Sequence, residues 1–150
     1  MNIKALVGAG HRVVGLALPF LAAGLAANLA RPTWFALGAG SAGRLVAVGL
    51  LVPGVALWLG SVVQILVNVP RGRLITTGPY ALVLHPLYTS VALLVLPGLG
   101  MLFDSWLGLP LGAILYGSSR LFSGQEEREL AARFPQAWPE YRRRVLLPWL

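Results

Sequence analysis

Long stretches without a single charged side chain are the feature that most restricts how this chain can fold. Asp, Glu, Lys and Arg are absent from Val13–Ala30, Leu45–Pro70, Leu74–Phe103 and Ser105–Ser119. A helix needs roughly 20 apolar residues to cross the hydrocarbon core of a bilayer. Hydrophobic residues make up 57% of the 150 residues and charged residues only 11%, which is more apolar surface than a domain of this size can bury. We therefore expect much of the surface to face lipid.

Turn-forming residues set the boundaries of the expected spans. Within Leu74–Phe103, Gly78-Pro79 and His85-Pro86 interrupt the apolar pattern, and proline is favoured as the first residue of a helix. We expect an all-α integral membrane protein with about four transmembrane helices in a single domain, residues 1–150. The last two helices should form a tight hairpin around Asp104, and the tail, residues 123–150, should form short cytoplasmic helices. The spans are expected at roughly 13–30, 45–68, 86–103 and 105–122.

The distribution of basic residues predicts how these spans are oriented. Of the 12 lysines and arginines, all but Arg31 and Arg44 lie before the first span, between the second and third spans, or in the tail. Basic residues concentrate on the cytoplasmic side of membrane proteins, so both termini are expected in the cytoplasm. The composition, with a single lysine among these residues, suggests a bacterial inner membrane. The net charge of +7 fits this topology better than nucleic-acid binding. The first span, having three others after it, is expected to be retained rather than cleaved as a signal peptide.

The segment before the third span, RGRLITTGPYALVLHPLY, concentrates polar and turn-forming residues. With Pro86 opening a helix, His85 lies beside unpaired backbone N–H groups, an environment that favours an anionic group. His85 could equally be an interfacial polar residue that caps the helix. Tyr80 and Tyr88 could be ordinary aromatic residues of the membrane interface. Gln64, on the second span, and Asn68 could contact a substrate or bond between helices.

The tail carries two apolar faces at helical spacing. Leu130 and Phe134 share one face, and Glu126 and Glu127 border it. These glutamates could belong to a site or to a solvated acidic turn. Glu129 lies four residues before an arginine, so we expect an exposed ion pair with Arg133.

A second tail helix should begin near Trp138-Pro139 and place Trp138, Tyr141 and Val145 on one face. The three consecutive arginines that follow Tyr141 are expected to contact lipid phosphates, at least two of them.

Taken in order, these motifs resemble the isoprenylcysteine carboxyl methyltransferase family and related membrane phospholipid N-methyltransferases. The resemblance covers about half of the chain, residues 74–148, and the first two spans are similar only in kind. It implies an integral membrane enzyme that uses S-adenosylmethionine, without a metal, to methylate a lipid-linked or hydrophobic acceptor at the cytoplasmic face. The motifs are Leu74-Ile75-Thr76-Thr77-Gly78-Pro79-Tyr80, His85-Pro86-Leu87-Tyr88, Glu126-Glu127, Leu130, Phe134, Trp138, Tyr141, Arg144-Val145 and Pro148.

The resemblance also implies roles for particular residues. Arg144 corresponds to an arginine that faces the acceptor carboxylate. His85 belongs to the cofactor pocket and would be the base, or a glutamate would, if the acceptor were an amine. The residues implied to bind the cofactor are Gly78, Tyr80, His85, Pro86, Tyr88, Glu126 and Glu127.

One departure from the family pattern concerns the residue before His85-Pro86. The family usually has arginine there, whereas this chain has Leu84. The missing cation could be replaced by Arg71, Arg73 or Arg120, or could signal an atypical substrate or a loss of activity. Three functions therefore remain open: carboxyl methylation, phospholipid or amine N-methylation, and a non-enzymatic membrane scaffold.

Overall fold

The protein is all-helical in the computed structural model, which describes residues 10–150. It contains no strand within this range, and only isolated bridges join extended residues. The long helices are α2 (Gly10–Ala30), α4 (Gly40–Asn68) and α8 (Gly108–Arg133). A fourth long helix is continuous from α6 (Pro86–Ser90) through the π-helical η2 (Val91–Val95) to α7 (Leu96–Leu102). The all-α class expected from the sequence is confirmed.

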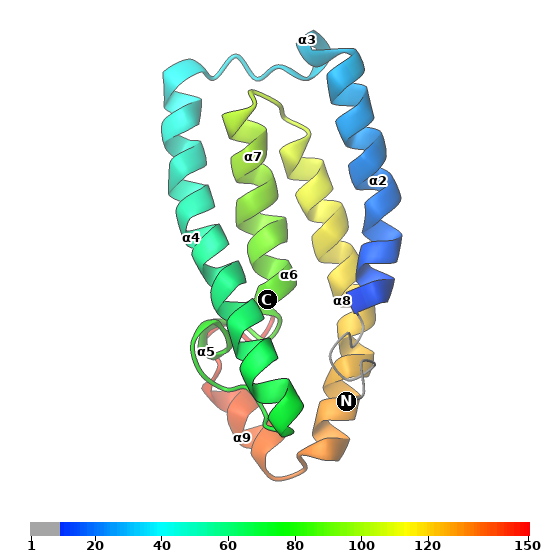
Figure 1. Cartoon of the computed structure of the whole chain (residues 1–150), viewed down its shortest axis with the longest axis vertical. Helices are drawn as coiled ribbons and strands as arrows, with labels where there is room; N and C mark the ends of the chain where they lie inside the picture. The colour runs from blue at the N-terminus through cyan, green and yellow to red at the C-terminus, as the bar shows by residue number, and fades with distance from the viewer. Residues whose placement is uncertain (1–9) are drawn as a thin grey trace.

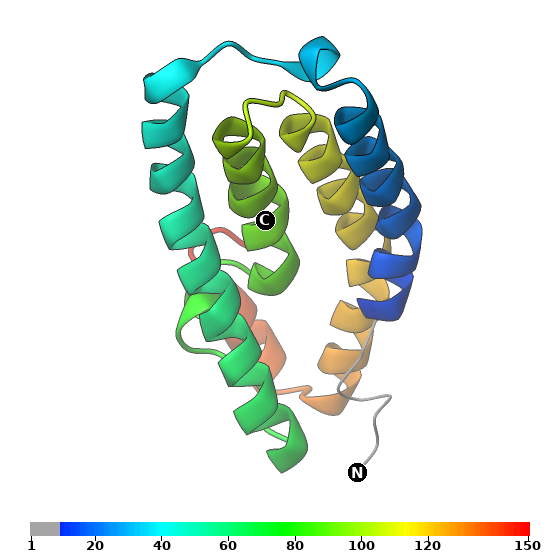
Figure 2. The ribbon, with the colours of Figure 1, turned by 45° about the horizontal axis from the view of Figure 1, so that its top comes forward.

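The long helices lie side by side in a single row (Figure 1). In this row α4 packs against α6, η2 and α7, these pack against α8, and α8 packs against α2. The tilted view of Figure 2 shows the same order, with α2 and α4 at opposite edges. Each edge helix therefore covers one neighbour and leaves most of its apolar surface outside the bundle.

Two of these helices are long and apolar enough to cross a membrane, by length and composition: Arg12–Ala30 and Gly40–Arg71. The third expected span corresponds to a shorter apolar helix, Pro86–Leu102. The fourth corresponds to the first part of α8. Large apolar side chains point outward along the two edge helices, including Leu29 at 73% exposure and Leu45 at 76%.

Short elements join the long helices at both ends. At one end, α3 (Pro32–Phe35) lies between α2 and α4, and the expected hairpin turns at Asp104, whose φ of 53° lies in the left-handed region. Its Oδ1 atom accepts a hydrogen bond from the Ala39 amide at 3.0 Å. At the other end are η1 (Val69–Arg71), α5 (Pro79–Leu82) and α9 (Ala137–Arg144). Gly78, with φ of 63°, makes the expected turn before α5.

The tail differs from its expected form in one respect. The fourth helix does not end near residue 122 but continues to Arg133, so only α9 is a separate short helix. Residues 125–133 are rich in strong helix formers, and no proline interrupts them. The glutamates therefore lie on the extension of a bundle helix, which fixes where their side chains point.

Backbone-to-backbone contact holds the hairpin together. An ideal Cβ atom added to Gly112 would collide with the carbonyl oxygen of Ala92, and one added to Gly108 would collide with that of Leu96. The two helices can approach this closely only because these positions carry no side chain. By contrast, an added Cβ at Gly117, also in α8, meets no atom within 4 Å.

Replacing Gly112 with alanine should therefore destabilise the protein. We expect Gly112→Ala to lower the free energy of unfolding by about 1–3 kcal/mol, the usual effect of overpacking a tight contact. Gly117→Ala is the matched control, and it should be neutral or stabilising by up to about 1 kcal/mol because alanine favours the helix. Thermal unfolding of the purified variants, followed by circular dichroism, measures both effects. Equal melting temperatures would contradict the close approach.

Candidate functional site

The C-terminal segment, residues 145–150, and α9 are hydrogen-bonded to α5, which precedes the third long helix. The amide of Leu146 donates to the carbonyl oxygen of Ala81 at 3.1 Å, and that of Leu147 donates to Leu82 at 2.9 Å. The Tyr141 hydroxyl donates to the Tyr80 carbonyl oxygen at 2.8 Å. Burial raises the pKa of the Tyr141 phenol, so it keeps the proton that it donates at neutral pH. These bonds hold α9 against residues 80–82.

Beneath this junction lies a small apolar cluster. Leu84, Trp138, Tyr141 and Val145 are each at most 6% exposed. The rings of Trp138 and Tyr141 meet edge to face, with centroids 5.7 Å apart. The face predicted for the second tail helix is thus confirmed, and Leu84, which stands where an arginine was expected, fills its core.

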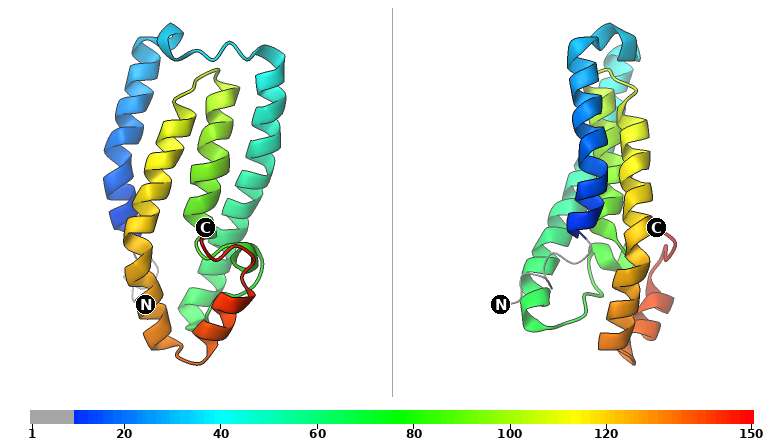
Figure 3. Two further views of the ribbon diagram at one scale, coloured as in Figure 1. Left: turned by 180° about the vertical axis from the view of Figure 1, so that it is seen from behind. Right: turned by 90° about the vertical axis from the view of Figure 1, so that its right-hand side faces the viewer.

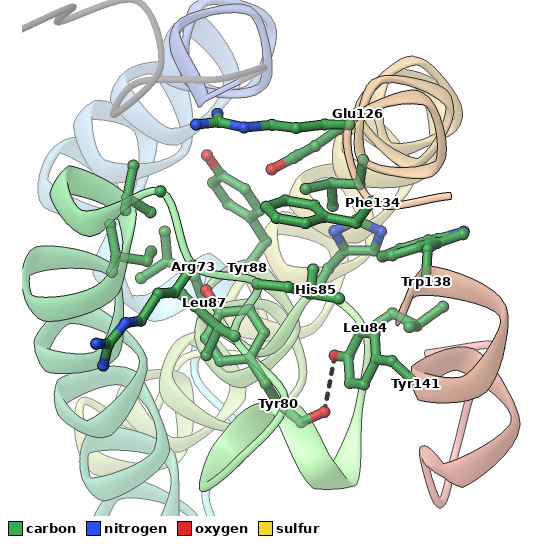
Figure 4. A pocket seen from close by; sticks show the side chains of 17 residues that line it. Arg73, Tyr80, Leu84, His85, Leu87, Tyr88, Glu126, Phe134, Trp138 and Tyr141 are labelled. Carbon is green, nitrogen blue, oxygen red and sulfur yellow. Dashed lines mark hydrogen bonds between the residues drawn. The ribbon is translucent and has the colours of Figure 1, made fainter. Parts of the chain in front are cut away.

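A cavity opens between this cluster, the end of α4 and the extension of α8 (Figure 4). The cavity has a volume of about 170 Å³, whereas one water needs roughly 10–15 Å³ by the same measure. The cavity can therefore hold a ligand rather than one or two waters. Its lining residues are Ile65, Val69, Gly72, Arg73, Leu74, Ile75, Tyr80, Leu84, His85, Leu87, Tyr88, Glu126, Leu130, Arg133, Phe134, Trp138 and Tyr141.

His85 lies between this cavity and an acidic partner. Its Nε2 atom is 3.3 Å from Oε1 of Glu127, and the two side chains are 10% and 16% exposed. The other carboxylate oxygen of Glu127 is 3.7 Å from Nη1 of Arg142. The hydrogen bond with His85, helped by the charges of Arg142 and Arg120, lowers the pKa of Glu127 despite partial burial. Glu127 thus stays ionised and fixes the His85 ring.

The neighbouring glutamate has the opposite electrostatic character. Glu126 lines the cavity, and burial raises the pKa of its carboxyl group. The negative charges of Glu129 and Glu127 add to this shift. A carboxylate held in an apolar enclosure gains more from a hydroxyl or cationic ligand than one in water does.

The structure brings together most, but not all, of the residues predicted for the site. Tyr80, His85, Tyr88 and Glu126 line the cavity, and Figure 4 shows them converging from α5, the start of α6, and α8. Glu127 lies behind His85 and contacts it.

The remaining predicted residues do not line the cavity. Pro86 is fully buried at the start of α6. Gly78 lies against the side chain of Gln64. Arg144 lies outside the cavity, with its side chain 77% exposed and bonded to Glu140.

The polar residues of the second long helix support the turn. The Asn68 amide nitrogen donates to Oε1 of Gln64 at 2.7 Å, and the Gln64 amide nitrogen reaches the Thr77 hydroxyl at 3.3 Å. The first bond lies within α4 and the second joins α4 to the turn, so neither is the bond between helices that the sequence left open.

Arg133 is the cavity residue whose position the sequence interpretation missed. The expected ion pair between Glu129 and Arg133 is wrong for the described residues: Glu129 instead accepts from the Gln125 amide at 3.1 Å. The Arg133 guanidinium lies 5.6 Å from the centre of the Phe134 ring. Arg133 follows Glu126 by seven residues, which returns it to the same helix face. The seven-residue spacing from Glu126 could therefore have predicted that Arg133 faces the cavity.

Comparisons with known proteins add no identification. No family model matches this chain, and neither curated proteins nor solved structures give a match.

Proposed function

We propose that this chain is an S-adenosylmethionine-dependent methyltransferase that acts on a lipid-linked or hydrophobic acceptor at the cytoplasmic face of a membrane. The observation that carries the proposal is the shared cavity of two segments far apart in the sequence, residues 72–88 and 126–141. These are the segments whose motifs resemble the isoprenylcysteine carboxyl methyltransferase family.

The chemistry of the cavity wall suits the parts of this cofactor. The Glu126 carboxylate can accept hydrogen bonds from ribose hydroxyls or pair with the cofactor's ammonium group. The rings of Tyr80, Tyr88 and Trp138 can pack against adenine or a sulfonium. Two arginines line the cavity: Arg73, one of the replacements that the sequence suggested, and Arg133. Either can meet a carboxylate and so replace the arginine that the family usually has at the position of Leu84. When bound, S-adenosylmethionine would supply an electrophilic methyl group.

The contribution of this chain to such a reaction would be positioning and exclusion of water. Holding two reactants in line can supply up to about 7–11 kcal/mol of acceleration in favourable cases. A carboxylate acceptor has no proton to lose and needs no base. An amine acceptor must lose a proton, and His85, which lies 3.3 Å from Glu127, or the half-buried Glu126 could accept it.

The same proposal includes a four-span topology in a bacterial inner membrane. The apolar edges of the bundle and two helices of spanning length support it. All the cavity residues lie at the end of the bundle that carries the basic loop and tail. Cofactor would enter from the cytoplasm, and an acceptor would enter sideways from the lipid.

The cofactor site can be tested by titration with S-adenosylhomocysteine in a calorimeter. We expect His85→Ala and Glu127→Gln each to weaken binding by about 1–3 kcal/mol, because each disturbs the hydrogen bond between these two side chains. Glu126→Gln should weaken binding by a similar amount, about 1–3 kcal/mol, because the cavity wall loses its carboxylate. Glu129→Gln, on the exposed face of the same helix, is the matched control and should change little. Absence of heat with the unaltered protein would favour a non-enzymatic scaffold.

The topology predicts that both termini are cytoplasmic. Reporter fusions after Leu150 and within residues 31–44 should therefore report opposite sides of the membrane, because basic residues are retained in the cytoplasm. A C-terminal fusion that reports the periplasm would contradict both the number of spans and the side proposed for the site.

The acceptor class can be tested by transferring a labelled methyl group into a total lipid extract and then adding base. We expect label that base releases as methanol, as methyl esters do. Arg144→Lys should then lower transfer about tenfold or more without changing cofactor affinity, since lysine cannot replace a bidentate grip. An acceptor would have to displace only the exposed bond to Glu140, a pair of a kind worth about 1 kcal/mol or less.

Arg143→Lys is the matched control for this variant. It should change methyl transfer little, because the family resemblance gives Arg143 no role at the acceptor and lysine keeps the positive charge. Base-stable label, together with full activity of Arg144→Lys, would instead favour amine N-methylation.

A further inference from the structure

A second hollow lies on the outside of the molecule, where α8, α9 and the C-terminal segment meet. Its lining residues are Arg120, Pro139, Arg142, Arg143, Pro148 and Trp149. None of them lines the cavity described above. The hollow is open to the surroundings, and its lining contains three arginines and, among the described residues, no carboxylate.

The hollow is built from separate parts of the chain that are held in place. Trp149 is joined to α8 by the Tyr116 hydroxyl, which donates to its carbonyl oxygen at 3.2 Å. Figure 3 shows the C-terminal segment beside α8. Arg120 comes from α8, whereas Arg142 and Arg143 come from α9. The arginines therefore converge through tertiary structure, beyond their proximity in sequence.

The surroundings of the hollow combine positive charge with exposed apolar side chains. Trp149 is 63% exposed, Leu146 67% and Leu121, next to Arg120, 74%. Tryptophan beside arginine is typical of the level where lipid headgroups meet acyl chains. Arginine forks bind phosphate oxygens in pairs.

We infer that this hollow binds the phosphate of an anionic phospholipid headgroup, with Trp149 against the upper part of the lipid's acyl chains. The inference rests on the proposed membrane location but not on the proposed cofactor. The arginines supply the phosphate ligands, and the exposed apolar side chains favour a lipid over a free anion or an acidic protein segment.

Glu127 joins this hollow to the cavity. Its two carboxylate oxygens contact Arg142 at 3.7 Å and His85 at 3.3 Å. A phosphate that draws Arg142 outward would compete with Glu127 for the guanidinium. The occupied hollow would thus change the charge that balances Glu127 behind the cavity.

Fluorescence quenching of Trp149 by brominated lipids tests the inference directly. The full chain is reconstituted in phosphatidylcholine bilayers that contain increasing fractions of brominated phosphatidylglycerol, or brominated phosphatidylcholine for comparison. The signal of Trp149 is isolated by subtracting the Trp149→Phe variant, since the chain has 5 tryptophans. We expect quenching at a much lower fraction of the anionic lipid than of the zwitterionic one.

Two double variants that remove the same amount of positive charge distinguish specific lipid binding in the hollow from general electrostatic attraction of anionic lipids. Arg120→Gln with Arg143→Gln should weaken the preference for the anionic lipid by about fivefold for each arginine. Arg71→Gln with Arg128→Gln removes two exposed arginines outside the hollow and should change it less than about twofold. Equal losses in both variants, or equal quenching by both lipids, would overturn the inference.

Two further measurements complete the test. Inorganic phosphate, added at constant ionic strength, should not relieve the quenching. If it does, the hollow takes a free anion and the lipid assignment is wrong. Binding of S-adenosylhomocysteine to the same double variants is measured separately, so failure of the lipid site and failure of the proposed function remain distinguishable.

Discussion

The hydrogen bonding of α9 and the C-terminal residues 146–147 to α5 is the interaction on which the cavity depends. One side-chain and two backbone hydrogen bonds join parts of the chain about 60 residues apart. Without them, only the apolar cluster and the contact with α8 would hold α9 in place. The position of Trp138 and Tyr141 on the cavity wall would then be less well defined. The apolar cluster shields these bonds from water, and each side-chain or backbone donor here has a nearby acceptor, which makes the junction specific.

The extension of α8 is the second requirement, and it explains why two adjacent glutamates have different environments. Successive residues on a helix point about 100° apart. Glu126 therefore faces the cavity and Glu127 faces His85 and Arg142. One carboxyl group has its pKa raised by burial, and the other has its pKa lowered by the hydrogen bond with His85. A rigid helix is needed to maintain this difference, because a flexible turn would let both side chains reach solvent.

Local patterns in the sequence predicted the parts of the fold that depend on nearest neighbours. Pro86 opening a helix, the turn at Gly78-Pro79, the hairpin at Asp104 and the buried face of Trp138 and Tyr141 all follow from spacing or backbone chemistry, and the structure has each of them. The sequence also predicted that the fourth span ends near residue 122, whereas α8 runs without a break to Arg133. Helix propensity, which continues through residues 125–133, does not depend on that boundary.

The residues that line the site were harder to predict. Their side-chain positions depend on whether local ion pairs or contacts between distant segments are more stable. Arg133 had an acidic partner at ideal helical spacing, yet it lies against Phe134 at the cavity. An exposed pair of this kind is worth only a few tenths of a kcal/mol, so aromatic and cavity contacts easily outweigh it. Arg144 presents the reverse case, since its local pair with Glu140 forms and keeps it outside.

Glu127 lines neither of the two hollows described above, but it contacts one residue of each. A carboxylate that is 16% exposed and contacts both an imidazole and a guanidinium is stabilised by both partners. If either partner moves away, the negative charge of Glu127 is less well compensated, and its contact with the other partner becomes stronger. Arg142, with its side chain 56% exposed, is the partner that can move, whereas His85 is fixed at the start of α6. An anion that attracts Arg142 would therefore change the interaction between Glu127 and His85, on the wall of the cavity. No movement of the backbone is needed for this change.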